Sequence, residues 1–221
     1  MKQTASREER VKSLRKDVYL IGITGGIAGG KSTVSARLRE LGAAVLDTDA
    51  IAHELAEPGG ALWHAYVTHF GEEILKSDKT LDRQAIGAKI FADAKERAWI
   101  NATAHPLIQA ELEKQIATAV KQGSQIIFLE VPLLFEAGWD RSVHAIWVVD
   151  IDEKTQLERL MKRDEIHRTA AEKKIQAQLS IKEKRKRADL IIDNSKDRKS
   201  VGIEIEKAYN SVLNSICIGS V

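Results

Sequence analysis

The 221-residue sequence is short of cysteine, of long apolar runs and of any excess of one charge. Its single cysteine, Cys217, permits no disulfide within the chain and no cysteine metal cluster, which suits a reducing compartment. We therefore expect a cytoplasmic protein. We expect no catalytic role for Cys217, because nothing near it in the sequence would activate a thiol.

No stretch approaches the roughly 20 apolar residues that a membrane-spanning helix needs. Residues 1–17 carry charges of both signs and lack an apolar core, so we interpret them as a solvated N-terminal extension rather than a secretory signal. The 34 basic and 32 acidic residues leave a formal net charge of +2, which argues against a dedicated nucleic-acid-binding protein. The basic run at 182–187 contains no aromatic residue for base stacking, and we interpret it as a solvated face.

Short apolar runs separated by helical patterns indicate an α/β fold. Five runs are predicted to be strands: 18–24, 43–46, 126–129, 145–149 and 190–192. Helices between them imply right-handed crossovers, and therefore a three-layer α/β/α arrangement around a mainly parallel five-stranded sheet. Residues 50–123 are too many for a simple crossover, so part of this stretch is expected to be a helical insertion at the sheet edge where ligands bind.

Residues 25–32 match the phosphate-binding pattern G-x-x-x-x-G-K-[ST], between a predicted strand and a predicted helix. Glycines allow a tight turn that points backbone N–H groups at phosphate oxygens. Lys31 would reach the β- and γ-phosphates, and Ser32 would place its hydroxyl on Mg²⁺. A glycine-rich turn that binds nothing is the alternative. If the pattern is a phosphate-binding loop (P-loop), the predicted nucleotide-binding residues are Gly26, Ile27, Ala28, Gly29, Gly30, Lys31, Ser32 and Thr33.

Two carboxylates follow the second predicted strand, in the triplet Asp47-Thr48-Asp49. Side chains at i and i+2 of an extended segment share a face, so either carboxylate could turn toward the phosphate site. There it could accept a proton from an attacking hydroxyl or help to hold Mg²⁺. For Asp47, capping the helix that follows is an equal alternative. Glu130 ends a strongly apolar run and could also assist Mg²⁺.

Further short motifs follow the triplet along the chain: Ile51-Ala52, then residues 81–83, 105–108 and 131–136. A final block consists of Arg159, Arg163-Asp164, Gln178, Ala188-Asp189 and residues 192–194. Together with residues 22–34 and 45–49, this order resembles the dephospho-coenzyme A (dephospho-CoA) kinase family. The resemblance covers about residues 18–194, and its distinctive part is 131–136 together with His105-Pro106.

The resemblance implies transfer of the γ-phosphoryl group of ATP to the ribose 3′-hydroxyl of dephospho-CoA, the last step of coenzyme A synthesis. It implies Asp49 as the catalytic base, and Lys31 and Ser32 in their P-loop roles with ATP and Mg²⁺. It also implies that Arg159 and Arg163 are lid arginines that close over ATP. The substrate site that it implies contains Asp49, Arg83, His105 and Pro132.

Arg159 and Arg163 also have a rationale in their spacing. They stand at i and i+4 of a predicted helix, so both guanidinium groups lie on one face, where they could straddle phosphate oxygens. Closure of such a face would exclude water. A solvated charged helix, with Glu158 and Asp164 as ordinary partners, is the alternative.

Other candidates have weaker signals. His105 precedes Pro106, a dipeptide that marks a helix boundary, and capping or packing is the alternative to a substrate role. Arg83 could meet a phosphate of the CoA moiety, although an arginine in a charged loop is usually solvated. His64 and His69 lie among aromatic residues, with no acid or cysteine at metal-ligand spacing, so ordinary packing is expected.

The predicted organisation is a nucleotide-binding core of residues 18–49, 106–157 and 188–221, a helical substrate domain at 50–105 and a lid at 158–187. The expected partner is the small-molecule substrate, with no nucleic acid and no membrane, in a monomer or small homo-oligomer. A nucleoside or nucleoside-monophosphate kinase is the main alternative function, because it shares the P-loop and the lid. A nucleotide-dependent switch would need segments that order around the γ-phosphate, and the sequence has no guanine-reading motif.

Overall fold

The computed structural model describes residues 15–218, which form two compact units. Within that range, the first unit contains residues 15–46 and 119–218, and the second contains residues 47–118. Most of the expected N-terminal extension and the side chain of Cys217 lie outside the described part, so the expectations for them stay untested.

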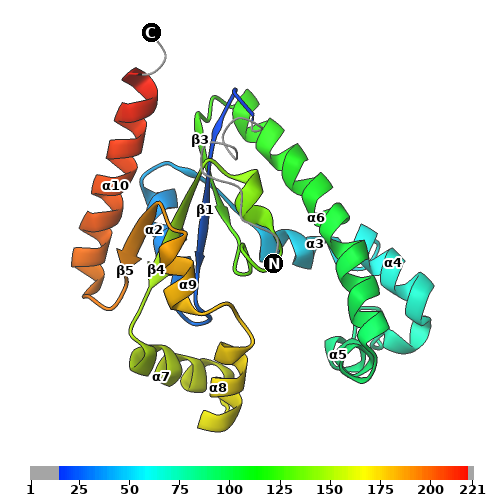
Figure 1. The fold of residues 1–221 in the computed structure, drawn as a ribbon. Helices are drawn as coiled ribbons and strands as arrows, with labels where there is room; N and C mark the ends of the chain where they lie inside the picture. Colours follow the sequence, from blue (N-terminus) through cyan, green and yellow to red (C-terminus); the bar gives the residue numbers. More distant parts are fainter. Residues whose placement is uncertain (1–14, 219–221) are drawn as a thin grey trace. The chain divides into compact units, whose positions relative to one another are not determined.

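The first unit alternates strands and helices along the chain (Figure 1). Its elements are β1 (Tyr19–Gly25), α2 (Lys31–Glu40), β2 (Ala44–Asp47, whose last residue begins the second unit), β3 (Ile126–Glu130), η2 (Trp139–Ser142), β4 (Ala145–Asp150), α7 (Glu153–Asp164), α8 (Arg168–Gln176), α9 (Ile181–Lys186), β5 (Leu190–Asp193) and α10 (Arg198–Ile218).

The strands form a five-stranded parallel sheet in the order β2-β3-β1-β4-β5, which confirms the predicted fold class. β1 is central: Ile23 pairs with Glu130 on one side, and Gly25 pairs with Val149 on the other. Parallel pairing brings the carboxyl ends of the strands to one edge, where ligands bind in such folds. The loop after β1 therefore begins at the functional edge of the sheet.

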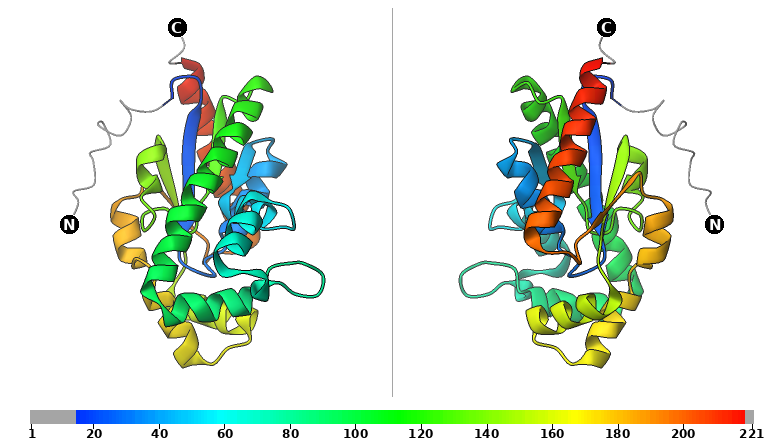
Figure 2. Two further views of the ribbon diagram at one scale, coloured as in Figure 1. Left: turned by 90° about the vertical axis from the view of Figure 1, so that its right-hand side faces the viewer. Right: turned by 90° about the vertical axis from the view of Figure 1, so that its left-hand side faces the viewer.

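One face of the sheet is covered by α2 and α10, which pack against each other. Alternate residues of the strands turn to this face, as the two-residue period of a strand requires. They meet Val34 and Leu38 of α2 and Val201 and Ile205 of α10, all almost fully buried. Burying each such side chain contributes about 1.5–3 kcal/mol, so this core fixes the helix that follows the phosphate loop. Figure 2 shows α10 running along the sheet.

Helices α7, α8 and α9 form the rest of the first unit. α7 packs against α8, and α9 packs against β4. In Figure 1, α7 and α8 lie beyond the carboxyl ends of the strands, on the side where β1 ends. Asp152 caps α7 by accepting the N–H of Thr155 at 2.9 Å, and α7 ends at Asp164, where the capping residue Glu165 has a φ of 53°.

The second unit is helical. It contains α3 (Thr48–Leu55), α4 (Ala61–Phe70), η1 (Glu72–Ile74), α5 (Arg83–Ala92) and most of α6 (Ala94–Lys121). Phe70, Ile74, Leu81 and Ile86 form its core. No described helix is both long and apolar enough to cross a membrane.

His64 and His69 contact neighbouring aromatic side chains, as expected. The ring of His69 stacks on Trp99 with centroids 3.6 Å apart, and its Nε2 lies 2.6 Å from Glu96 Oε2. His64 meets Trp63 edge to face at 5.0 Å. Among the described residues, no three histidine, cysteine or acidic side chains converge as a metal site would require.

Two local predictions are wrong. His105 and Pro106 do not mark a helix boundary, because both lie inside α6. The aversion of a residue before proline to helix is a bias, and packing overrides it here: Ala104 and Leu112 of the same helix are buried. The triplet Asp47-Thr48-Asp49 is not extended, because α3 begins at Thr48, so Asp47 and Asp49 do not share a face as residues i and i+2 of a strand would.

Candidate active site

The phosphate loop turns sharply between β1 and α2. Ala28 has φ 57° and Gly30 has φ 90°, and the Gly29 N–H donates to the Gly26 carbonyl at 3.0 Å. Lys31 is the first residue of α2, and its Nζ lies 3.2 Å from the Gly26 carbonyl oxygen. The cation is therefore held over the loop at the N-terminal, electropositive end of the helix, which is the arrangement that binds phosphate.

Gly30 is required by both conformation and space. A Cβ on Gly30 would lie 1.9 Å from Asn194 Nδ2. Asn194 cannot simply swing away, because it is buried and donates to the Gly29 carbonyl at 2.9 Å. The positive φ adds strain for any residue with a side chain.

The matched pair Gly30→Ala and Gly42→Ala separates these two effects. Gly42 also has a positive φ, 84°, but nothing lies within 4 Å of its missing Cβ. We expect Gly42→Ala to lose about 1–2 kcal/mol of stability and to bind ATP normally. Gly30→Ala should weaken ATP binding at least about tenfold as well, since the loop must move. Urea unfolding measures the stability of each variant, and calorimetric titration measures its affinity for ATP. Equal affinities in the two variants would contradict this account.

Three amide side chains hold the loop through its backbone. Gln156 of α7 donates to the Ile27 carbonyl at 2.9 Å, and Gln178, between α8 and α9, accepts the Ile27 N–H at 2.9 Å. Asn194, after β5, holds Gly29 from the other side. The backbone carbonyl of Ile27 is thus bound by α7, the helix that leads into the predicted lid. Its backbone N–H is bound by Gln178, within the predicted lid. Gln156 has no distinguishing signal in the sequence, and Gln178 and Asn194 stand out there only as members of a motif block.

Lys184 corrects the interpretation of 182–187 as a solvated run. Its side chain is fully buried, and its Nζ lies 3.0 Å from Glu136 Oε1. The same ammonium lies 3.3 Å from the Gly25 carbonyl and 3.4 Å from the Pro132 carbonyl. One cation therefore joins the end of β1, the loop after β3 and α9. Its partners are distant in sequence, so charge pattern alone could not reveal them.

Replacing Lys184 with Met should destabilise the protein by about 1–3 kcal/mol, because two carbonyls lose their donor and Glu136 loses its cation. Lys182→Met is the control, since Lys182 belongs to the same basic run but is exposed, and it should change stability by less than about 0.5 kcal/mol. The free energy of unfolding in urea measures both. Equal values would show that the buried contacts of Lys184 contribute nothing.

The two predicted lid arginines differ in surroundings. Both are exposed on α7, and Arg159 Nη1 lies 3.7 Å from the point that a Cβ on Gly30 would occupy. Arg163 Nε instead donates to Asp164 at 2.8 Å, and Lys174 of α8 binds the same carboxylate at 2.6 Å. These two cations lower the pKa of Asp164 to about 2. The structure thus brings Arg159, but not Arg163, to the phosphate loop.

Asp47 caps α3. Its Oδ1 accepts the N–H groups of Asp49 at 2.9 Å and of Ala50 at 3.3 Å, which supports the capping alternative for Asp47. Asp49 is exposed in the first turn of α3, two residues after β2 ends.

The predicted substrate residues lie in both units. Pro132 follows β3, and its carbonyl also accepts the Thr24 hydroxyl at 3.1 Å. Arg83 opens α5 and is exposed, with its Nη2 2.6 Å from His53 Nδ1. His105 is exposed on α6.

The oxygen donors near the loop fit a magnesium ion. The Ser32 side chain is exposed in the first turn of α2, and Glu130 ends β3 beside Ile23. Because Mg²⁺ prefers few protein ligands and keeps water or phosphate oxygens, one hydroxyl and one nearby carboxylate are a suitable set.

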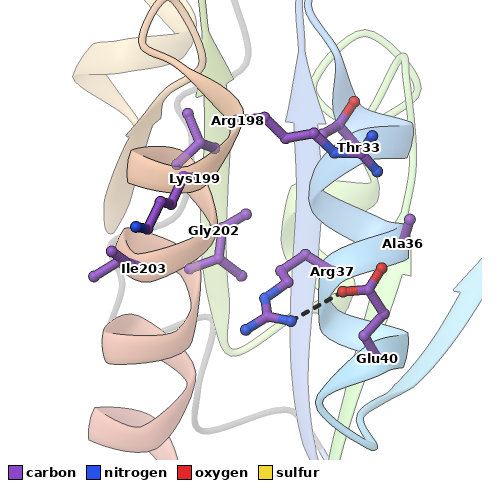
Figure 3. A pocket seen from close by; sticks show the side chains of 10 residues that line it. Thr33, Ala36, Arg37, Glu40, Arg198, Lys199, Gly202 and Ile203 are labelled. Carbon is purple, nitrogen blue, oxygen red and sulfur yellow. Dashed lines mark hydrogen bonds and ion pairs between the residues drawn. The ribbon is translucent and has the colours of Figure 1, made fainter.

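Two cavities lie in the first unit, and one of them adjoins the loop. One, of about 310 Å³, lies between α2 and α10 and begins at Thr33 (Figure 3). There Arg37 binds Glu40 and Glu206, each at 2.9 Å, and the contact with Glu40 is the main cause that raises the pKa of Arg37. The other, of about 1140 Å³, is lined by Gly26, Gln156 and Gln178 and by residues of α7, α8 and α9. Of these two cavities, the second borders the loop, at Gly26.

Comparison with protein families decides between the possible P-loop proteins. Residues 19–200 match the family model described as dephospho-CoA kinase. The chain belongs to the dephospho-CoA kinase family. Other P-loop kinases share the loop geometry, but this match covers most of the sequence, as the motif order predicts.

Individual relatives of the dephospho-CoA kinase family agree. A dephospho-CoA kinase from Symbiobacterium thermophilum is 45% identical over 192 residues, covering 87% of this chain and 80% of the relative. A dephospho-CoA kinase domain-containing protein from Danio rerio is 40% identical over 196 residues, covering 88% and 86%. The solved dephospho-CoA kinase from Campylobacter jejuni is 28% identical with a TM-score of 0.66, covering 87% of this chain and 96% of that one.

Proposed function

We propose that this chain transfers the γ-phosphoryl group of ATP to the ribose 3′-hydroxyl of dephospho-CoA, giving CoA and ADP. The observation that carries the proposal is a phosphate loop of the required geometry within a chain that matches the dephospho-CoA kinase family over residues 19–200.

ATP binds with its phosphates on the loop. Backbone N–H groups of residues 26–33 and the Lys31 ammonium surround the β- and γ-phosphates at the start of α2. The hydrogen bonds of Gln156 and Gln178 to Ile27, and that of Asn194 to Gly29, hold this backbone in shape before ATP binds. Binding ATP therefore costs little reorganisation. Ser32 would hold Mg²⁺, with Glu130 as a candidate second ligand. Bound Mg²⁺ neutralises charge on the phosphate oxygens.

Asp49 acts as the general base. It accepts the proton of the ribose 3′-hydroxyl as the oxygen attacks the γ-phosphorus. Its exposure in the first turn of α3 leaves the carboxylate accessible to an acceptor, and Asp47 supports it by capping the same turn.

Arg159 stabilises the charge that spreads over the transferring phosphoryl oxygens. Its guanidinium already lies beside Gly30, and it stands on the same helix as Gln156, which binds the loop. Arg163 would join it only after exchanging Asp164 for a phosphate oxygen. On the acceptor side we assign Arg83, His105 and Pro132 to dephospho-CoA. Residues 50–105 would form the substrate domain and residues 158–187 the lid.

The proposal is tested by ADP release from purified protein with Mg-ATP, comparing dephospho-CoA with AMP, CMP, adenosine and no acceptor. Release should depend on dephospho-CoA. Release that depends instead on a nucleoside or a nucleoside monophosphate would keep the chemistry and overturn the acceptor. ATP binding without acceptor-dependent release would favour a binding module.

A further inference from the structure

The backbone at Arg83 is anchored within the second unit. Leu81 is buried and forms an isolated antiparallel bridge with Leu75, and the Asp82 N–H donates to the Ile74 carbonyl at 2.7 Å. Asp82 then caps α5 by accepting the N–H groups of Gln84 and Ala85. The Arg83 side chain therefore leaves from a fixed point and not from a loose loop.

The direction of that side chain is set by His53. Arg83 Nη2 lies 2.6 Å from His53 Nδ1, and among the described residues His53 is the one hydrogen-bond partner of the guanidinium. A guanidinium can only donate, so in this contact Nδ1 is the acceptor. Nε2 faces Glu57 Oε1 at 3.5 Å. Glu57, His53 and Arg83 thus form a chain that turns one guanidinium edge toward α3 and leaves the other donors exposed.

His53 also places Arg83 near the proposed base. Asp49 and His53 are four residues apart on α3, and both are exposed, so they lie on one face about one helical turn apart. The acceptor has a matching layout, because dephospho-CoA carries its diphosphate on the 5′ carbon of the ribose whose 3′-hydroxyl reacts. A cation one turn from the base can meet the diphosphate while the base meets the hydroxyl.

We propose that His53 is a positioning residue, which holds the Arg83 guanidinium so that its remaining N–H donors bind the 5′-diphosphate of the acceptor. The inference deepens the proposed function and rests on it. Arginine binds phosphate through paired N–H donors, so its orientation decides how well it binds. Loss of His53 should therefore weaken acceptor binding and leave ATP binding unchanged.

Three variants test the proposal through steady-state kinetics. His53→Ala removes the acceptor of the Arg83 hydrogen bond and should raise KM for dephospho-CoA about tenfold, with KM for ATP and kcat within about twofold. His53→Asn keeps an acceptor oxygen near the position of Nδ1 and should restore KM for dephospho-CoA to within about threefold of the unsubstituted protein. His64→Asn, on α4 of the same unit and exposed, should change none of these values.

The double variant Arg83→Met with His53→Ala shows whether His53 acts through Arg83. If it does, KM for dephospho-CoA should match that of Arg83→Met alone, since the two effects share one interaction. Unchanged KM in His53→Ala, equal losses in His53→Ala and His53→Asn, or additive effects in the double variant would each overturn the inference. If the unsubstituted protein does not use dephospho-CoA at all, the proposed function itself fails, and the two failures are thereby distinguished.

Discussion

Replacing Asp49 with Asn should lower the turnover of dephospho-CoA by roughly 10²–10⁴-fold, the usual contribution of a positioned general base. Asn has nearly the same shape as Asp but cannot accept the hydroxyl proton. ATP binding should change little, because phosphate contacts are assigned to the loop and to Lys31. Single-turnover phosphoryl transfer together with calorimetric titration of ATP measures both quantities.

Asp47→Asn is the matched control for Asp49. Asp47 caps α3, and Asn caps helices about as well as Asp, so this variant should keep turnover within a few-fold. Near-normal turnover in Asp49→Asn would remove Asp49 from the mechanism. A large loss in Asp47→Asn with little loss in Asp49→Asn would assign the base to the first carboxylate instead.

Replacing Arg159 with Met should lower kcat by roughly 10²–10³-fold, the range seen when a group that stabilises transition-state charge is removed. Met keeps much of the length of the side chain and removes the guanidinium that lies beside Gly30. KM for dephospho-CoA should change far less, because the interaction is made with the transferring phosphoryl group. Initial rates at saturating ATP and dephospho-CoA measure the effect.

Arg168→Met provides the control for Arg159. Arg168 is an exposed arginine on α8 that pairs with Glu172 at 2.7 Å, an exposed pair that contributes little stability. It should retain kcat within about twofold. Equal losses in both variants would point to a general effect of positive charge in these helices, and an active Arg159→Met would exclude the assigned role.

The strands and the phosphate loop could be predicted because their signals are local. The run at 18–24 is apolar and ends at glycines, and the structure places β1 at Tyr19–Gly25. The loop pattern predicts its own conformation, since its glycines and Lys31 must stand at fixed spacing. The same holds for the end of α2, where Gly42 has the positive φ that favours glycine after a helix.

The side chains that support the loop could not be predicted, because their roles depend on distant partners. Lys184 stands among charged residues, yet it bonds to Gly25, 159 positions away, and to Pro132, 52 positions away. Gln156 reaches Ile27 across 129 positions. A local sequence pattern indicates whether a segment is exposed on average. It does not identify a single polar side chain that the fold buries against backbone carbonyls.

The acceptor side shows the same limit. Arg83 could be singled out as a phosphate ligand from the motif order, but its partner His53 lies 30 positions away on another helix. The spacing of Asp49 and His53 has meaning only once α3 is known to begin at Thr48, whereas residues 47–49 are predicted from the sequence to be extended.

The central claim is tested most directly by identifying the product. Purified protein is incubated with Mg-ATP and dephospho-CoA, the product mass is measured, and phosphorus NMR locates the new phosphate. The account predicts one CoA molecule per ADP, with the phosphate on the ribose 3′ oxygen. ADP formed without a phosphorylated acceptor, or a phosphate at any other position, would contradict it.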